Sequence, residues 1–170
     1  LLTALGMPNA RFKGEFTPTS SFLPHGREEF EFGFSANAGS SFGSLKKVAS
    51  GGELSRIMLS IKAILSQYKA LPTIIFDEID TGVSGEVAVK ISEIMKDMGQ
   101  YMQVISITHL PQVAAKGGHH FKVFKTIQDN QTSTQMKKLS AQERIVEIAG
   151  MLGGEEQSAT AIEHAKELLN

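Results

Sequence analysis

Residues 73–78 read Thr-Ile-Ile-Phe-Asp-Glu, and this stretch decides the fold that the sequence predicts. An apolar run of strand length ends in two carboxylates, and a helical period follows over 86–98. A second apolar strand, which should be buried, fits 102–107. Short apolar strands that alternate with amphipathic helices are typical of an α/β fold with a mainly parallel sheet flanked by helices. Ligands bind such sheets at the carboxyl ends of the strands, which is where Asp77 and Glu78 stand.

The residues before this stretch predict an antiparallel addition to the sheet. Strands fit 11–16 and 28–34 on either side of a Pro/Ser-rich turn region, and Phe30, Phe32 and Phe34 alternate with other residues, so one face should be buried. A helix is expected over 54–65, because its apolar residues recur at helical spacing as one stripe. The stripe comprises Leu54, Ile57, Met58, Ile61, Ile64 and Leu65.

The residues after it predict a short helical segment over 110–115, strands over 119–125 and 132–139 joined by an Asp129-Asn130 turn, and two helices. Ser140 and Glu143 have the spacing of a capping box, and the helix they begin should stop at Gly153-Gly154. The last helix covers about 158–169. We expect one domain over 1–170, with residues 1–5 as the stub of a helix cut from a longer chain.

Composition excludes several classes of protein. The 170 residues contain no cysteine, which rules out a disulfide scaffold, a cysteine zinc site and a cysteine nucleophile. The net charge is −1, so the chain lacks the excess of basic residues that is typical of a dedicated nucleic-acid binder. No apolar run approaches the roughly 18 residues of a membrane span, so we expect no membrane partner and a cytoplasmic location.

The stretch Ser50-Gly51-Gly52-Glu53, directly before the helix at Leu54, is the first candidate site. Two glycines let a backbone approach a ligand closely, and the N–H groups at a helix N-terminus attract anions. The same residues also fit a plain helix N-cap after a flexible loop.

Two further candidate groups stand at strand ends. Asp77 could hold Mg²⁺ through water while Glu78 orients or deprotonates a water molecule, although a solvated acidic turn is equally consistent. His109, in Thr108-His109, could contact a phosphate or a catalytic acid, or be structural. A metal site at His119-His120 is disfavoured, because no acid lies nearby at ligand spacing.

Taken in order, these groups resemble the ABC-type ATPases, in the branch that holds the SMC-like repair proteins. VASGGELSR at 48–56 resembles the signature motif and its helix, IIFDE at 74–78 resembles Walker B with its catalytic glutamate, and ITH at 107–109 resembles the switch histidine. No G-x-x-x-x-G-K-[ST] loop occurs in the chain. The resemblance therefore implies the C-terminal half of an ABC-type P-loop ATPase head, with the Walker A half and a coiled coil elsewhere in the parent protein. Residues 1–5 would be the stub of the second coiled-coil arm.

The resemblance implies roles for the residues at each motif. Asp77 would help to hold Mg²⁺ through water, Glu78 would polarise the attacking water, and His109 would contact the γ-phosphate region of ATP. The signature residues would bind ATP held by an opposite head, and the D-loop would adjoin them. These cofactor-binding residues are Ser50, Gly51, Gly52, Glu53, Asp80 and Ser84. Ser84 stands where many SMC-like heads have aspartate.

The resemblance also implies partners and a process. The chain would pair with the N-terminal Walker A half of the same protein and with a second head in an ATP-dependent homodimer. It would meet DNA through the full-length protein, at the nucleoid, in recombinational repair of double-strand breaks. One alternative is an ABC ATPase subunit of a membrane transporter, in which glutamine usually replaces Glu53. Another is a non-catalytic ATP-gated dimerisation module, which often lacks the acid at Glu78.

Overall fold

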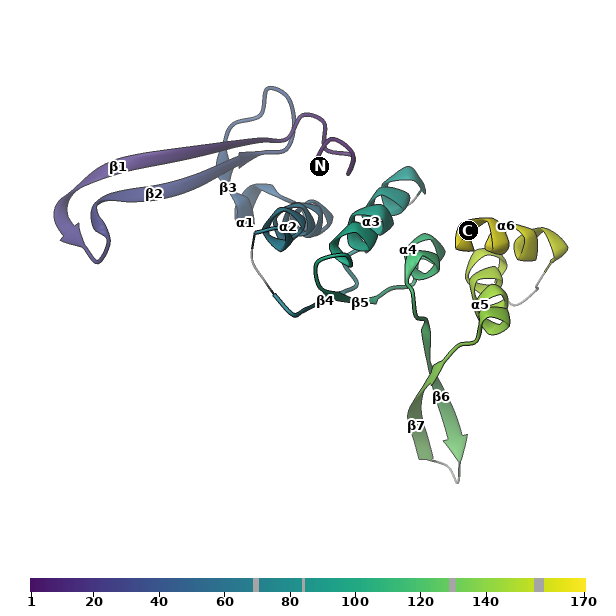
Figure 1. The fold of residues 1–170 in the computed structure, drawn as a ribbon. Helices are drawn as coiled ribbons and strands as arrows, with labels where there is room; N and C mark the ends of the chain where they lie inside the picture. The colour runs from purple at the N-terminus through teal and green to yellow at the C-terminus, as the bar shows by residue number, and fades with distance from the viewer. Residues whose placement is uncertain (69–70, 84, 129–130, 155–157) are drawn as a thin grey trace. The chain divides into compact units, whose positions relative to one another are not determined.

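The chain divides into two compact units, which the computed structural model describes over residues 1–68, 71–83, 85–128, 131–154 and 158–170 (Figure 1). The first unit comprises Leu1–Leu71 and Ile79–Lys90, and the second comprises Pro72–Glu78 and Ile91–Asn170. The predicted Asp129-Asn130 turn and the predicted D-loop residue Ser84 lie outside the described residues.

The first unit is built on a long antiparallel hairpin of β1 (Arg11–Leu23) and β2 (Gly26–Ser35), with β3 (Gly43–Ser44) added beside β2 (Figure 1). β1 extends well past the predicted end at residue 16, so most of the predicted 17–27 turn region is strand. Pro18 is accommodated because the register becomes irregular between Pro18 and Leu23, where a missing N–H breaks no regular ladder. The chain reverses at Pro24-His25, and Gly26 follows with a φ of 131°, which suits glycine.

One face of this hairpin is aromatic and open. Phe12 pairs with Phe34 and Phe16 with Phe30, and neighbouring ring centroids lie 4.9–6.2 Å apart. Phe34 is fully buried, whereas Phe16 is 66% and Phe30 is 55% exposed. The prediction of a buried face is therefore correct for Phe34 and wrong for Phe30 and Phe32. We call Phe12, Phe16, Phe30 and Phe32 the aromatic face.

The first unit also contains the helices α1 (Leu45–Val48) and α2 (Gly51–Ser66), together with the first residues of a third helix up to Lys90. α2 starts three residues before the prediction, because Ser50 caps it and draws the two glycines into its first turn. Ile57 of α2 packs in a core with Met7 and Phe34. The predicted apolar stripe is covered on one side only, since Met58, Ile61 and Ile64 are exposed.

The second unit contains the parallel pair β4 (Thr73–Asp77) and β5 (Gln103–Ile107), which confirms the parallel α/β prediction. Between them in sequence lies α3 (Gly85–Met98), whose residues after Lys90 belong to this unit. Parallel strands are normally covered on both faces. Here Ile75, Ile105 and Ile107 are exposed, so the prediction that the strand over 102–107 is buried is wrong for one face.

The rest of the second unit comprises α4 (Pro111–Lys116), the antiparallel hairpin of β6 (Phe121–Gln128) and β7 (Gln131–Lys138), α5 (Ala141–Gly153) and α6 (Ala159–Leu169). The helices share a core of Ala115, Ile148, Ala149, Ala161 and Ala165.

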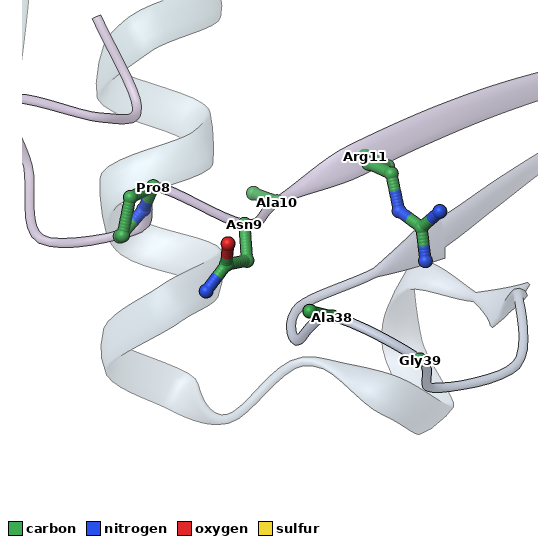
Figure 2. Close-up of a pocket in the computed structure, with 6 residues that line it drawn as sticks. All are labelled: Pro8, Asn9, Ala10, Arg11, Ala38 and Gly39. Carbon is green, nitrogen blue, oxygen red and sulfur yellow. The ribbon is translucent and has the colours of Figure 1, made fainter.

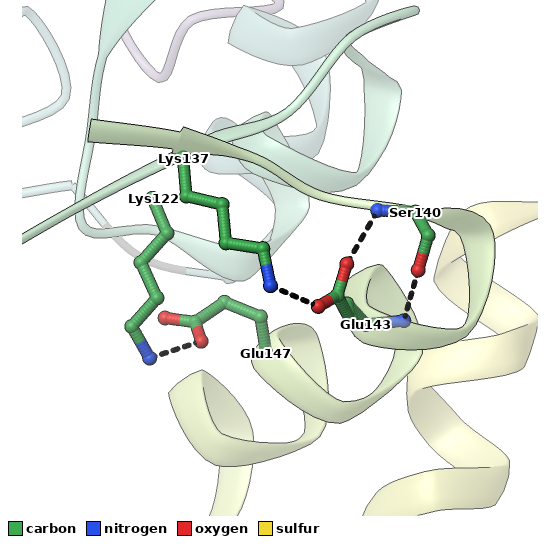
Figure 3. A network of polar contacts seen from close by, with 5 residues as sticks. All are labelled: Lys122, Lys137, Ser140, Glu143 and Glu147. Atoms are coloured by element: carbon green, nitrogen blue, oxygen red, sulfur yellow. Dashed lines mark hydrogen bonds and ion pairs between the residues drawn. The ribbon is translucent and has the colours of Figure 1, made fainter.

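The ends of α5 confirm two predictions. Ser140 and Glu143 form the capping box, and the helix ends at Gly153 with Gly154 at φ 75°. Lys137 and Lys122 of the hairpin pair with Glu143 and Glu147 of α5 (Figure 3). Within the described residues, no helix is both long and apolar enough to cross a bilayer.

Candidate functional site

The carboxyl edge of the β4–β5 pair brings two predicted groups together. Asp77 lies opposite Ile107 in the parallel register, and the Glu78 N–H continues the ladder by donating to the Ile107 carbonyl at 3.0 Å. Asp77-Glu78 and Thr108-His109 therefore leave the sheet at the same edge, where ligands of α/β sheets bind. Asp77, Glu78 and His109 are all exposed at this edge.

Glu78 has an unusual backbone. Its φ of 47° makes it the one non-glycine residue with positive φ in the described part of the chain. A left-handed conformation costs a residue with a Cβ about 1–2 kcal/mol. Such outliers concentrate at functional sites, where they aim a side chain away from the direction that the strand would give it.

The turn that carries His109 is held by its neighbours. The Leu110 N–H donates to the Thr108 hydroxyl at 2.9 Å, a local side-chain turn that ends β5. Pro111 then starts α4, because its fixed φ suits the first helical position. His109 is thus fixed between a strand end and a helix start.

In the first unit, Ser50 and Glu53 form a capping box at the start of α2. The Ser50 hydroxyl accepts from the Glu53 N–H at 3.4 Å, and the Glu53 carboxylate accepts from the Ser50 N–H and hydroxyl, both at 2.7 Å. These hydrogen bonds from Ser50 lower the pKa of Glu53, with the charge of Arg56 as a smaller cause, and outweigh the effect of burial. Glu53 therefore stays ionised and orients Ser50.

Gly51 and Gly52 have no packing reason to be glycine. A Cβ at Gly51 would meet nothing within 4 Å, and one at Gly52 would make ordinary contacts with Arg56 and the Thr81 carbonyl at 3.6 and 3.7 Å. Both residues are helical, and the N–H groups of a first turn lack intrahelical acceptors. The two glycines therefore leave space for a ligand to approach the backbone closely, and their N–H groups are available as hydrogen-bond donors to it.

The predicted D-loop residue Asp80 also belongs to the first unit. It is 1% exposed, and its carbonyl accepts from the Val83 N–H at 3.2 Å. Ser50, Gly51, Gly52, Glu53 and Asp80 thus lie in the first unit, whereas Asp77, Glu78 and His109 lie in the second.

The predicted Mg²⁺ role falls on Asp77, an exposed carboxylate at the end of β4. Among the described residues, no three His, Asp or Glu side chains gather as a metal cage. Mg²⁺ usually binds one or two carboxylates together with water and substrate phosphates, so an exposed Asp77 fits such a shared site.

The first unit also contains an open pocket of about 270 Å³ (Figure 2). Its lining contains none of the predicted site residues; it is formed by Pro8, Asn9, Ala10, Arg11, Ala38 and Gly39. We assign it no part in the site.

Sequence reasoning missed Arg144 of α5, which lies far in the sequence from the three motifs around Ser50, Asp77 and His109. Its guanidinium Nη2 donates to the carbonyls of Ala115 and Gly117, at 3.1 and 2.7 Å, at the end of α4. Contacts to backbone carbonyls leave no pattern of residue types, so no sequence signal could have revealed them.

Comparison with known proteins places these features in context. The chain is 40% identical over 169 residues to the DNA repair protein RecN of Deinococcus radiodurans, which covers 99% of the chain and 29% of that protein. It is 50% identical over 139 residues to RecN of Bacillus subtilis, covering 82% of the chain and 24% of that protein. The chain thus spans about three-tenths or less of these relatives. No protein-family model matches it.

Solved structures show the same fold at low sequence identity. An SMC ATPase from a study of ATP-driven dimerisation and DNA-stimulated activation matches with a TM-score of 0.58 and 18% identity, over 91% of this chain and 88% of that one. The Smc head domain of Pyrococcus yayanosii matches with a TM-score of 0.61 and 18% identity, over 99% of this chain and 28% of that one. Over nearly its whole length, the chain therefore resembles one segment of the bacterial DNA repair protein RecN, and it has the fold of an SMC ATPase head.

Proposed function

We propose that this chain is the C-terminal half of the ATPase head in a RecN-like protein that repairs DNA double-strand breaks. The observation that carries the proposal is the carboxyl edge of β4 and β5, where Asp77 and the left-handed Glu78 emerge beside Thr108-His109. Acids and a histidine at one edge of a parallel pair suit phosphoryl chemistry on a bound nucleotide. The similarity to RecN proteins supports the same reading, and it gives no support to a transporter subunit.

Asp77, Glu78 and His109 have different roles in ATP hydrolysis. Asp77 associates with Mg²⁺ through water, and the ion, when bound, neutralises charge on the phosphates. Glu78, whose φ of 47° departs from the extended backbone of the strand, orients the attacking water and accepts its proton. His109 contacts the γ-phosphate region. Each of these groups acts on a nucleotide that the parent protein supplies through its Walker A loop.

The signature turn acts on a second nucleotide. Ser50, Gly51 and Gly52 close on the γ-phosphate of ATP held by the opposite head, with Glu53 holding Ser50 in place and Asp80 and Ser84 in the adjoining D-loop. The Ser50 hydroxyl donates to Glu53 in the present structure. The backbone N–H groups of Gly51 and Gly52 are therefore the donors ready for an anion.

The exposed apolar faces support a covering partner. The aromatic face, the Ile75–Ile105 face of the parallel pair and the outer side of α2 are all open. Contiguous exposed apolar surface marks an interface. We propose that the N-terminal Walker A half of the same protein covers them, that two heads then pair around ATP, and that DNA is bound by the assembled protein. Alone, the chain should not hydrolyse ATP, since it has no phosphate-binding loop.

Substitution of Glu78 by Gln in the full-length parent tests this function. The amide keeps the size and the backbone strain of Glu78 but cannot take the water proton, so single-turnover hydrolysis should fall by about 10²–10⁴-fold. ATP affinity should stay at the parental value, and the ATP-bound head dimer should accumulate in sedimentation.

Asp77→Asn is the comparison variant. It should weaken the Mg²⁺-dependent part of nucleotide affinity, which Glu78→Gln leaves intact. Parental hydrolysis by Glu78→Gln would show that Glu78 is not the catalytic acid.

A further inference from the structure

The helix that follows His109 cannot hold itself in place. α4 has six residues, and isolated helices shorter than about 12–15 residues are marginal in water. The Val113 and Ala114 N–H groups donate to the Leu110 carbonyl at 3.2 and 3.0 Å, so the turn after His109 and the start of α4 are one piece. Any tilt of α4 therefore moves the backbone of His109.

Two contacts fix α4 from the side of α5. Ala115 is buried against Ile148 and Ala149. Arg144 donates from Nη2 to the Ala115 and Gly117 carbonyls, at 3.1 and 2.7 Å. The last carbonyls of a helix have no donors within the helix, and a cation at that end also interacts favourably with the helix dipole. Arg144 therefore clamps the end of α4 that is farther from His109.

Arg144 is itself held rigidly. Its N–H donates to the Ser140 carbonyl at 2.9 Å in the capped first turn of α5. Its side chain is half-buried, and the Nε atom is shielded from solvent. A half-buried guanidinium with a planar fork is a stiff link between two helices.

We propose that Arg144 is a positioning residue for His109, acting through α4. The inference rests on the proposed function, because it assigns no chemistry to Arg144 and supposes that His109 meets the nucleotide. Loss of Arg144 lets α4 shift, and a misplacement of about 1 Å near reacting groups can cost about 10²-fold in rate. Arg144, which belongs to none of the ATPase motifs, thereby affects the rate of ATP hydrolysis.

The test is a double-mutant cycle in the full-length parent protein, with His109→Ala, Arg144→Ala and the double variant. Single-turnover ATP hydrolysis should fall by about 10- to 100-fold for Arg144→Ala, with ATP affinity unchanged. The double variant should be no slower than His109→Ala, because a misplaced histidine and an absent one are the same defect. Multiplying effects would mean that Arg144 acts apart from His109, which would overturn the inference.

Two further variants guard against a trivial loss of folding. Arg144→Lys can reach one of the two carbonyls, so its hydrolysis rate should lie between those of the parent and Arg144→Ala. Hydrogen exchange of the 113–116 amides should speed up in the same order. Lys122→Ala is the matched control, since it removes a cation that pairs with Glu147 of α5 and touches no α4 carbonyl. Its hydrolysis should equal that of the parent.

The outcomes separate the two proposals. If His109→Ala slows hydrolysis while Arg144→Ala and Arg144→Lys do not, the positioning role is wrong and the proposed function stands. If His109→Ala itself hydrolyses ATP at the parental rate, the role of His109 in the proposed function is wrong, and the positioning role fails with it.

Discussion

At the scale of single residues, the site works against local stability in two places. Glu78 holds a left-handed backbone that glycine would adopt without strain, and Gly51 occupies a helical position that alanine would stabilise. A Cβ at Gly51 would meet nothing within 4 Å among the described residues, so packing does not require glycine there. Residues that lower stability without a structural reason indicate selection for function.

Gly51→Ala is the sharpest test of this idea. The new methyl group would enter open space at a helical φ, so the folded protein should gain about 0.4–1 kcal/mol of unfolding free energy. The same methyl group would stand in the way of a phosphate that approaches the first turn of α2. ATP-dependent head association of the parent, measured by sedimentation, should therefore weaken.

Gly150→Ala in α5 is the matched control, because a Cβ there also meets nothing within 4 Å. It should stabilise the fold by a similar amount and leave head association unchanged. Equal association by the parent and Gly51→Ala would remove the signature turn from the dimer contact.

Much of the site could be predicted at this scale, and the remainder had a physical reason to stay hidden. The identity and order of the Ser50, Asp77 and His109 motifs stand in the sequence. The left-handed φ of Glu78 does not, because glutamate gives no sign that it will adopt that conformation. Arg144 was missed because its partners are carbonyls more than 25 residues away in the sequence.

At the scale of elements, an ion pair between Lys137 and Glu143 connects the β6–β7 hairpin to the start of α5. The hydrogen bond from Lys137, followed by that from the Ser140 N–H, lowers the pKa of Glu143 to about 2 from its ordinary value of 4.5 (Figure 3). A lowered pKa in the folded state means that the ionised form is stabilised by folding. This contribution is complete above pH 4.5 and disappears as the pH falls towards 2.

Glu143→Gln should therefore change the acid stability of the protein. Glutamine keeps the capping geometry but loses the charge, so the gap in unfolding free energy between parent and variant should be constant at neutral pH. The gap should close as the pH falls from 4.5 towards 2, as followed by denaturant unfolding at a series of pH values. Lys137→Met should also reduce the pH dependence, whereas an unchanged gap near pH 2 would contradict the assignment.

The elements themselves were largely predictable, but the burial of their faces was not. Strand and helix types follow from periodicity, and the Ser140–Glu143 box located the start of α5 correctly. Periodicity tells which residues share a face and says nothing about what covers it. The aromatic face and the open side of β5 were therefore expected to be buried, yet they are exposed in this chain.

At the scale of the whole molecule, those open faces set the behaviour of the chain in solution. Phe16 is 66% and its strand partner Phe30 is 55% exposed. Apolar surface of this kind associates with whatever apolar surface is present. When the 170-residue chain is made by itself, the only partner available to the aromatic face is a second copy of the chain.

The chain alone should thus self-associate as its concentration rises, and Phe16→Lys should reduce that association in sedimentation. The lysine replaces a ring of the aromatic face with a charge and removes no buried contact. Thr17→Lys is the matched control, because it adds the same charge to the next residue, on the opposite face of the hairpin. Equal association of the unsubstituted chain, Phe16→Lys and Thr17→Lys would show that the aromatic face does not mediate self-association.

The parallel pairing of β4 with β5 has a consequence for synthesis. The two strands pair over residues separated by 30 positions, such as Thr73 and Gln103, whereas β1 and β2 meet through a tight turn. Closing a longer loop costs more chain entropy, so pairing of this kind forms late. On a ribosome, β4 emerges first and waits without its partner until residue 107 has left the exit tunnel. The strand that leads into the two site carboxylates is thus secured later than the β1–β2 hairpin in a growing chain.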